Sequence, residues 1–258
     1  MIGFVLALGM GMVLGLLGGG GSILTVPILV YLFKVPAALA TGYSLFVVGI
    51  TSAIAAFRYR RQLNWRVGAL FAVPSTIGVI LSRRYVLQPM PDQLSLGTMI
   101  VSKDDLIMIV FGILVVLISF FMLRAKEENH VVEQKKQTLT SMVLITMEGL
   151  VVGGITGFVG AGGGFMIVPA LTLLVGISMR EAIATSLLII SLKSLIGFLG
   201  DIQLSIAMDG WFLMGFTMVT VIGSVIGVQL NQKVSVTLLR KAFAYLVFIV
   251  GINILIFH

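Results

Sequence analysis

Long uncharged apolar runs are the feature that most limits what this chain can fold into. Several reach about 20 residues, the length that a helix rising 1.5 Å per residue needs to cross roughly 30 Å of hydrocarbon. Hydrophobic residues make up 59% of the 258 and charged residues only 10%. A water-soluble domain of this size has more polar residues to cover its surface. The sequence therefore predicts an all-α, polytopic membrane protein.

Two glycine runs interrupt this apolar pattern, and they lie in segments that resemble each other. Residues 15–27 read GLLGGGGSILTVP, and residues 157–169 read GFVGAGGGFMIVP. The two segments align from end to end without a gap. A two-residue shift then brings Ala40-Thr41 onto a second Ala-Thr pair, Ala184-Thr185. The sequence therefore predicts two homologous halves.

Each half has the same expected plan. We expect a first transmembrane repeat over 1–123, a cytoplasmic linker over 124–138, and a second transmembrane repeat over 139–258. Each repeat opens with a glycine-broken region, at 2–33 and at 139–176, and continues with three plainer transmembrane helices. The expected helices cover 36–57, 67–86, 105–123, 181–199, 210–230 and 241–257.

The length of the glycine-broken regions, 2–33 and 139–176, leaves two forms open. Each region is longer than one straight crossing requires and short for two full crossings. Each is therefore either a tilted, discontinuous helix that crosses once or a re-entrant hairpin that returns to its own side. The first form makes the two halves parallel in the membrane, and the second makes them inverted.

The basic residues favour the inverted arrangement. If each broken region crosses once, eight Lys or Arg lie on each side of the membrane. If each region returns to its own side, twelve basic residues lie on one side and four on the other, a normal cytoplasmic excess. The N-terminus is then outside. The twelve are Arg58, Arg60, Arg61, Arg66, Arg124, Lys126, Lys135, Lys136, Arg180, Lys233, Arg240 and Lys241, and the four are Lys34, Arg83, Arg84 and Lys103.

The glycine runs predict an opened helix at membrane depth. A glycine costs roughly 0.8–1 kcal/mol relative to alanine inside a helix, and main-chain groups opened there need protein or cavity water as partners. Amides at half-helix N-termini hold anions in transporters with repeated halves. We therefore expect the two runs to form an anion-binding site of main-chain amides, called the cradle below. The alternative is that these glycines only allow close helix packing. The candidate residues are Gly18, Gly19, Gly20, Gly21 and Ser22 in the first half, and Gly160, Ala161, Gly162, Gly163 and Gly164 in the second.

Hydroxyl groups near the breaks are the next candidates, since they can donate hydrogen bonds to anionic oxygens. Thr41 and Thr185 are preferred because the aligned halves retain both. For each hydroxyl the alternative is a bond to a carbonyl of its own helix. The other hydroxyls considered on these helices are Ser44, Ser52, Ser186, Ser191 and Ser194.

Two charged residues lie near the middle of apolar runs: Glu148 in VLITMEGLVVGG and Lys193 in LLIISLKSLIGF. A charge inside the membrane indicates a functional site and a partner. We expect Lys193 to attract an anion and Glu148 to carry a coupling proton. Two alternatives stay open: the two residues pair with each other, or Lys193 extends to the membrane surface.

Other classes of protein find little support in the composition. The formal charge is +7, but the basic residues lie between apolar segments, where they set orientation, so no nucleic-acid partner is expected. There is no cysteine and there are only two histidines, so we expect no cofactor and no metal site. The expected partners are a small anionic substrate and the lipid bilayer, and a homodimer is left open.

With both glycine segments in view, the sequence resembles the TauE/SafE family of sulfite and organosulfur-anion exporters, also called the toluene sulfonate uptake permease family. The resemblance covers nearly the whole chain. Two departures affect the symmetry of the cradle: Ser22 stands opposite Gly164, and Ala161 opposite Gly19. The residues that carry the resemblance are Gly157, Gly160, Gly162, Gly163, Gly164 and Pro169, their counterparts Gly15, Gly18, Gly20, Gly21 and Pro27, and the two Ala-Thr pairs.

The resemblance implies a secondary transporter of sulfite, thiosulfate, sulfonates or related anions in the bacterial inner membrane, with export the expected direction. A passive anion channel is the alternative, since it would use the same cradle. An intramembrane enzyme built on Lys193 with Ser191 and Ser194 is a third hypothesis. We do not expect it, because neighbouring positions on a helix do not face one another.

Overall fold

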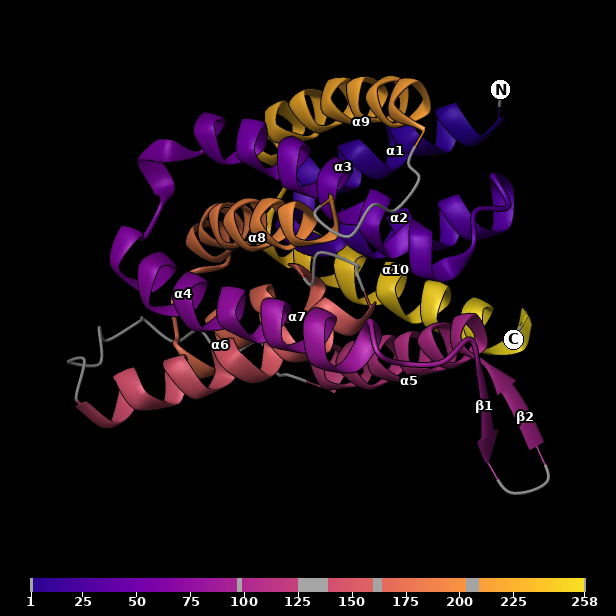
Figure 1. Ribbon diagram of the computed structural model, residues 1–258. Helices are drawn as coiled ribbons and strands as arrows, with labels where there is room; N and C mark the ends of the chain where they lie inside the picture. Colours follow the sequence, from indigo (N-terminus) through magenta and orange to yellow (C-terminus); the bar gives the residue numbers. More distant parts are fainter. Residues whose placement is uncertain (1, 97–98, 125–138, 160–163, 203–208, 258) are drawn as a thin grey trace.

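A computed structural model describes residues 2–96, 99–124, 139–159, 164–202 and 209–257 of the chain. The described part is helical except for one antiparallel hairpin, in which β1 (Gln93–Leu96) pairs with β2 (Met99–Ser102). Figure 1 shows helices packed side by side, with both chain ends and this hairpin at the same end of the molecule. The described part is thus almost entirely helical, in agreement with the all-α class predicted from the sequence.

The elements of the first half follow the expected order. A glycine-broken region is followed by three long helices, and the hairpin precedes the last of them. The elements are α1 (Ile2–Leu17), a 3₁₀ segment (Gly18–Leu24), α2 (Thr25–Pro27), a π-helical turn (Ile28–Leu32), α3 (Ala37–Arg58), a 3₁₀ turn (Arg60–Gln62), α4 (Trp65–Ser82), a π-helical turn (Arg83–Leu87), β1, β2 and α5 (Lys103–Arg124).

The second half has the same order of helices without a hairpin in its described part. Its elements are α6 (Leu139–Val159), α7 (Gly164–Pro169), a π-helical turn (Ala170–Leu174), α8 (Met179–Ile202), α9 (Gly210–Asn231) and α10 (Val236–Phe257). The six plainer helices predicted from the sequence correspond to α3, α4, α5, α8, α9 and α10. The β hairpin was not predicted. The linker beyond Arg124 lies outside the described residues.

Several helices meet the requirements for crossing a membrane. In the part of the chain that the structure describes, four are long and apolar enough to do so: Ala37–Arg58, Trp65–Leu87, Met179–Gly200 and Gly210–Asn231. Shorter apolar helices accompany them, among them Gly3–Leu17 and Ile145–Val159. The chain is therefore a multi-pass membrane protein.

The first glycine-broken region folds back on itself as a hairpin. A Cβ on Gly3, at the start of α1, would overlap the ring of Phe33, which follows the π-helical turn. The rings of Phe4 and Phe33 stack edge to face with centroids 5.6 Å apart. Since α1 alone is 16 residues, or about 24 Å, long, the chain has turned back on itself between these contacts. The tilted single crossing does not describe residues 2–33.

Close packing joins helices that are not neighbours in the sequence. In the pair α1 and α9, a Cβ on Gly15 would overlap the carbonyl oxygen of Ser224, and one on Gly227 that of Met12. In the pair α4 and α6, a Cβ on Gly153 would overlap the carbonyl oxygen of Ser75. Small residues let these backbones touch, as they do between many membrane helices.

Helices α3 and α8 pack against each other in the interior of the molecule. Gly49 of α3 is in contact with Leu195 of α8, because a Cβ there would lie 2.8 Å from the Leu195 side chain. The two helices start at equivalent places, since their first residues are separated in the sequence by the same interval as the two aligned glycine segments. The two-residue shift inferred from the sequence is therefore absent from the helix starts, and in this alignment Tyr43 rather than Thr41 corresponds to Thr185.

Candidate functional site

The first glycine run opens the chain as its composition predicts. Helix α1 ends at Leu17, and Gly18 has a φ of +70°, a conformation that costs other residues about 1–2 kcal/mol. A 3₁₀ segment follows. At Gly18 the chain also packs against α8, since a Cβ there would lie 2.9 Å from Ser186 Oγ. The helix break is therefore seated on α8.

The two glycine-rich segments meet in the interior. A Cβ on Gly19 would overlap the backbone of Gly164, and a Cβ on Gly164 would overlap Gly19 and the side chain of Ile190. The two backbones therefore touch with no side chain between them, so at this point close packing, the alternative considered from the sequence, operates. The candidates Gly160, Ala161, Gly162 and Gly163 lie outside the described residues.

The remaining candidates of the first run are Gly20, Gly21 and Ser22. Gly20 lies in the 3₁₀ segment, and a Cβ on Gly21 would overlap Leu14. Ser22 is fully buried, and its Oγ donates a hydrogen bond to the carbonyl of Gly19 at 2.6 Å. This bond holds the opened segment in its 3₁₀ form.

Buried side chains satisfy carbonyl groups where the helices end at the breaks. The Tyr59 hydroxyl donates to the carbonyl of Gly15 at 3.0 Å, and Asn231 Nδ2 to that of Leu16 at 2.6 Å. At the end of α6, Arg83 Nη1 donates to the carbonyl of Gly157 at 3.1 Å.

All three donor side chains, Tyr59, Asn231 and Arg83, are buried. They supply the partners that carbonyls of a helix end require at membrane depth. The sequence analysis missed this role. Arg83 counted there only as a charge between helices, and its position directly after an apolar run gave no sign that it turns inward.

The two threonine candidates are engaged with the protein. Thr41 Oγ1 donates to the carbonyl of Ala38 in its own helix at 2.7 Å. Thr185 Oγ1 accepts from the N–H of Asn64, the N-cap residue of α4, at 3.0 Å. Thr185 therefore fixes the start of a neighbouring helix.

Tyr43, which lies as far from the start of α3 as Thr185 lies from the start of α8, makes a similar contact. Its hydroxyl accepts from the N–H of Asp209, the N-cap residue of α9, at 2.6 Å. A side chain at this position of each inner helix therefore holds the start of another helix.

The other hydroxyls on α3 and α8 form two groups. Ser186 and Ser191 bond to carbonyls of α8, the usual arrangement for a hydroxyl inside a helix. A second group is fully buried and makes no hydrogen bond within the described part of the chain. This group consists of Ser44, Thr51, Ser52 and Ser194.

Lys193 is the buried cation of α8. Its side chain is 1% exposed, and its Nζ donates to Thr156 Oγ1 of α6 at 2.9 Å. Thr156 Oγ1 donates in turn to the carbonyl of Gly153 at 3.2 Å. Lys193 therefore does not extend to the membrane surface, and its ammonium faces a neutral hydroxyl rather than a serine of its own helix.

Glu148 is half-buried on α6, two helical turns before Thr156. Its Oε2 is buried and makes no hydrogen bond with the described residues. Among those residues no ion pair joins Glu148 to Lys193, whose ammonium bonds to Thr156 instead. The pairing considered from the sequence is therefore absent.

Lys193 lies near the start of α7. One turn before it on α8, Ile190 touches Gly164, the first residue of α7. Thr156, which holds the Lys193 ammonium, lies in the last turn of α6. The structure thus brings together Gly164, the buried cation and a hydroxyl.

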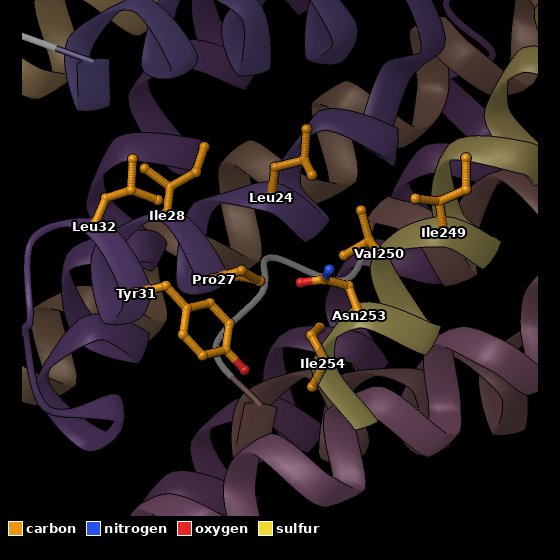
Figure 2. A pocket seen from close by; sticks show the side chains of 9 residues that line it. All are labelled: Leu24, Pro27, Ile28, Tyr31, Leu32, Ile249, Val250, Asn253 and Ile254. Carbon is orange, nitrogen blue, oxygen red and sulfur yellow. The ribbon is translucent and has the colours of Figure 1, made fainter. Parts of the chain in front are cut away.

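A hollow of about 380 Å³ lies elsewhere, between the return limb of the first hairpin and α10 (Figure 2). Its lining is apolar except for Tyr31 and Asn253. In Figure 2 Tyr31 projects from the hairpin wall toward the α10 wall, which carries Asn253 and Ile254. None of the predicted site residues lines this hollow. An apolar hollow suits hydrocarbon better than a small anion.

Comparisons with known proteins identify the family of this chain. The family model described as sulfite exporter TauE/SafE matches residues 3–254. A probable membrane transporter protein of Xylella fastidiosa (strain 9a5c) is 30% identical over 250 residues, covering 95% of this chain and 90% of the relative.

More distant relatives carry the same description. Probable membrane transporter proteins of Methanocaldococcus jannaschii and Bacillus subtilis (YdhB) are each 25% identical and cover 95% of this chain, and 93% and 96% of their own lengths. No solved structure matches the chain. Since the family model spans nearly the whole sequence, the chain belongs to the sulfite exporter TauE/SafE family of membrane transporters.

Proposed function

We propose that this protein is a secondary transporter that exports small sulfur-containing anions, such as sulfite, thiosulfate or sulfonates, across the bacterial inner membrane. The observation that carries the proposal is the burial of Lys193 without a negatively charged partner among the described residues. Its ammonium bonds to a hydroxyl and to no carboxylate in the described part of the chain, and such a charge is costly inside a membrane unless an anion joins it. Membership of the TauE/SafE family supports the sulfur-containing class of substrate.

The proposed substrate site uses both glycine segments. In this proposal, main-chain amides of Gly18, Gly19, Gly20, Gly21, Ser22 and Gly164 supply donors for anionic oxygens; the other predicted residues, Gly160, Ala161, Gly162 and Gly163, lie outside the described part of the chain. Thr41 and Thr185 border the site, and Lys193 supplies the charge. The Gly19–Gly164 contact closes the space between the segments in this conformation, so we propose that the segments separate to admit the anion.

We propose that the halves form an inverted repeat. The hairpin form of residues 2–33 supports it. If the glycine-broken region returns to its own side, each half crosses the membrane three times, so the second half begins on the opposite side from the first. The exchange of partners also supports it: α1 packs on α9 and α6 on α4 through equivalent glycines. An inverted pair of hairpins offers two related conformations, one open to each side of the membrane.

Glu148 is the proposed coupling residue. It lies on the helix that holds the Lys193 ammonium through Thr156, and one of its carboxyl oxygens has no protein partner among the described residues. A proton on Glu148 would neutralise a charge that is unfavourable at this depth. The residue that binds the proton and the residue that holds the Lys193 ammonium would then lie on the same helix, α6.

A flux assay in proteoliposomes tests this function. With methanesulfonate inside, whose charge does not change with pH, an imposed proton gradient should change its rate of export by wild-type protein, whereas a passive channel would respond only to the electrochemical gradient of the anion. Lys193→Met should abolish this flux. Glu148→Gln should keep flux but remove its response to the proton gradient. Absence of flux for every sulfur anion would contradict the proposed function.

A further inference from the structure

We propose that a groove between α4 and α6 binds a phospholipid with an anionic headgroup. The Arg66 guanidinium holds the lipid phosphate, and an acyl chain lies along the apolar walls of the groove. None of the residues predicted for the substrate site lines this groove. The lipid site is therefore independent of the proposed transport function, and either can fail without the other.

The first step of the argument is the lining of the groove, which has a volume of about 470 Å³. It is open to the surroundings of the protein, since Val73 on its wall is 62% exposed, and its floor is the buried Pro74. The lining combines one cation, four apolar residues and one hydroxyl: Arg66, Ala69, Leu70, Val73, Pro74 and Thr146.

The second step is the position of the charge along the groove. Helix α4 begins at Trp65, so Arg66 lies in its first turn, at the membrane surface. Pro74 lies about 12 Å further along the helix axis, and half of the hydrocarbon layer is about 15 Å thick. The groove thus extends through about one leaflet, with its charge at the surface end. A phospholipid has the same distribution of charge and apolar length.

The third step is the other wall, which α6 supplies. The two helices run parallel, because a Cβ on Gly149 would lie 2.9 Å from Pro74 and one on Gly157 would lie 2.8 Å from Val79. Both helices begin at the end of the molecule opposite the β hairpin (Figure 1). The contact between Gly149 and Pro74 brings the helices together, and it therefore ends the groove at depth.

The fourth step is the electrostatic complementarity of the groove to an anion. Arg66 is exposed and makes no hydrogen bond or ion pair within the described part of the chain. Glu148 lies two residues after Thr146, and therefore on the opposite side of α6. A lipid phosphate at the end of the groove supplies the negative charge that Arg66 lacks. Basic pockets between transmembrane helices bind anionic headgroups in this way.

The equivalent place at the other end of the molecule has no cation. Asn64 and Asp209 are the N-cap residues of α4 and α9, so Trp211 takes the place of Arg66 at the start of α9. Trp211 is 89% exposed. Tryptophan is common at membrane surfaces and carries no charge. We therefore expect a preference for anionic lipid at the start of α4 and a smaller one at the start of α9.

The two tryptophans of the chain allow this preference to be measured. Trp211→Phe leaves Trp65, which is 62% exposed and adjacent to Arg66, as the fluorescent reporter. The protein is reconstituted in phosphatidylcholine vesicles that contain increasing amounts of either brominated phosphatidylglycerol or brominated phosphatidylcholine, since bromine quenches tryptophan on contact. Quenching of Trp65 should show about 5-fold tighter binding of phosphatidylglycerol. Trp65→Phe, which leaves Trp211 as the reporter, should show a smaller preference.

Four variants in the Trp211→Phe background connect the preference to the groove. Arg66→Gln should remove most of it, and Arg66→Lys, which keeps the charge, should retain it. Val73→Phe should remove it as well, because the larger side chain fills the groove while Arg66 is intact. Arg61→Gln is the matched control, since Arg61 is an exposed cation near the start of α4 that does not line the groove; this variant should keep the preference.

Three results would overturn the inference. Equal quenching of Trp65 by the two brominated lipids would show that no anionic lipid is preferred there. Equal losses in Arg61→Gln and Arg66→Gln would show that the charge of the whole membrane face attracts the lipid, without a site in the groove. Release of brominated phosphatidylglycerol by inorganic phosphate would show a site for small anions rather than for a lipid.

Discussion

Thr156 is the residue on which the Lys193 ammonium depends. Its hydroxyl accepts the ammonium hydrogen bond at 2.9 Å and passes its own proton to a carbonyl of α6. No sequence pattern marks Thr156, because a threonine inside a helix usually bonds only to its own helix. Lys193 and Glu148, in contrast, stand out in the sequence because charges are rare in such runs.

Thr156→Val should therefore lower the stability of the protein, because it removes the hydrogen-bond partner of the buried Lys193 ammonium. Valine has nearly the same shape but no acceptor, and a lost hydrogen bond to a charged group costs about 1.5–3 kcal/mol. We expect a lower thermal midpoint in detergent and a raised KM for the anion in proteoliposomes. Thr156→Ser, which keeps the oxygen, should restore both; failure of this rescue would show that the methyl group matters instead.

The contact between the two glycine segments has a separate consequence for stability. Gly19→Ala places a Cβ into the backbone of Gly164, and overpacking of this kind costs about 1–3 kcal/mol. Gly154→Ala is the matched control, because a Cβ there meets nothing within 4 Å. Thermal denaturation in detergent should show a loss for the first variant and none for the second. Equal midpoints would contradict the close approach.

At the scale of helices and strands, hydrophobic length and the glycine runs predicted most of the structure. The helices α3, α8 and α9 begin and end within about three residues of the expected ranges. The glycine runs predicted a break, and Gly18 opens it. What the sequence could not decide was the path after the break, since a tilted helix and a hairpin use the same residues; the Gly3–Phe33 contact decided it.

The pairing of helices that are not neighbours in the sequence also escaped prediction. Glycines at helical spacing indicate packing, but they do not name the partner helix. The structure shows that α1 packs on α9 and that α6 packs on α4, although neither pair is adjacent in the chain. The short hairpin of β1 and β2 was missed because strands of four residues each give little periodic signal.

Gly227→Val should separate α9 from α1. A Cβ there would overlap the carbonyl oxygen of Met12, whereas a Cβ on Gly215, on the same helix, meets nothing within 4 Å. We expect Gly227→Val to lower the thermal midpoint and to reduce disulfide trapping between cysteines placed on α1 and α9. Gly215→Val is the control for adding the same side chain to α9, and an equal effect of both would point to helix propensity rather than packing.

For the whole molecule, the absence of native cysteine makes the membrane topology directly measurable. Inverted halves place Arg60, Ser178 and Gln232 on one side, and Lys34 and Gln88 on the other. All five side chains are exposed. Parallel halves instead place Ser178 and Gln232 opposite Arg60.

Single cysteines at these positions should therefore react with an impermeant maleimide from two different sides. We expect Ser178→Cys and Gln232→Cys to be labelled from the same side as Arg60→Cys, the cytoplasm. Lys34→Cys should be labelled from outside. Labelling of Ser178→Cys together with Lys34→Cys would mean that the glycine-broken regions cross the membrane, against the hairpin form.

The contact between Gly19 and Gly164 limits which second mutations can compensate for a larger side chain at either position. Most packing faults in a protein core can be repaired genetically, because a larger side chain at one position is tolerated once its neighbour becomes smaller. Here both neighbours are already the smallest residue, so no intragenic suppressor can arise at the partner position. A screen for restored transport after Gly19→Ala should return true revertants, or changes on α8 at Ile190 that leave Gly164 more room.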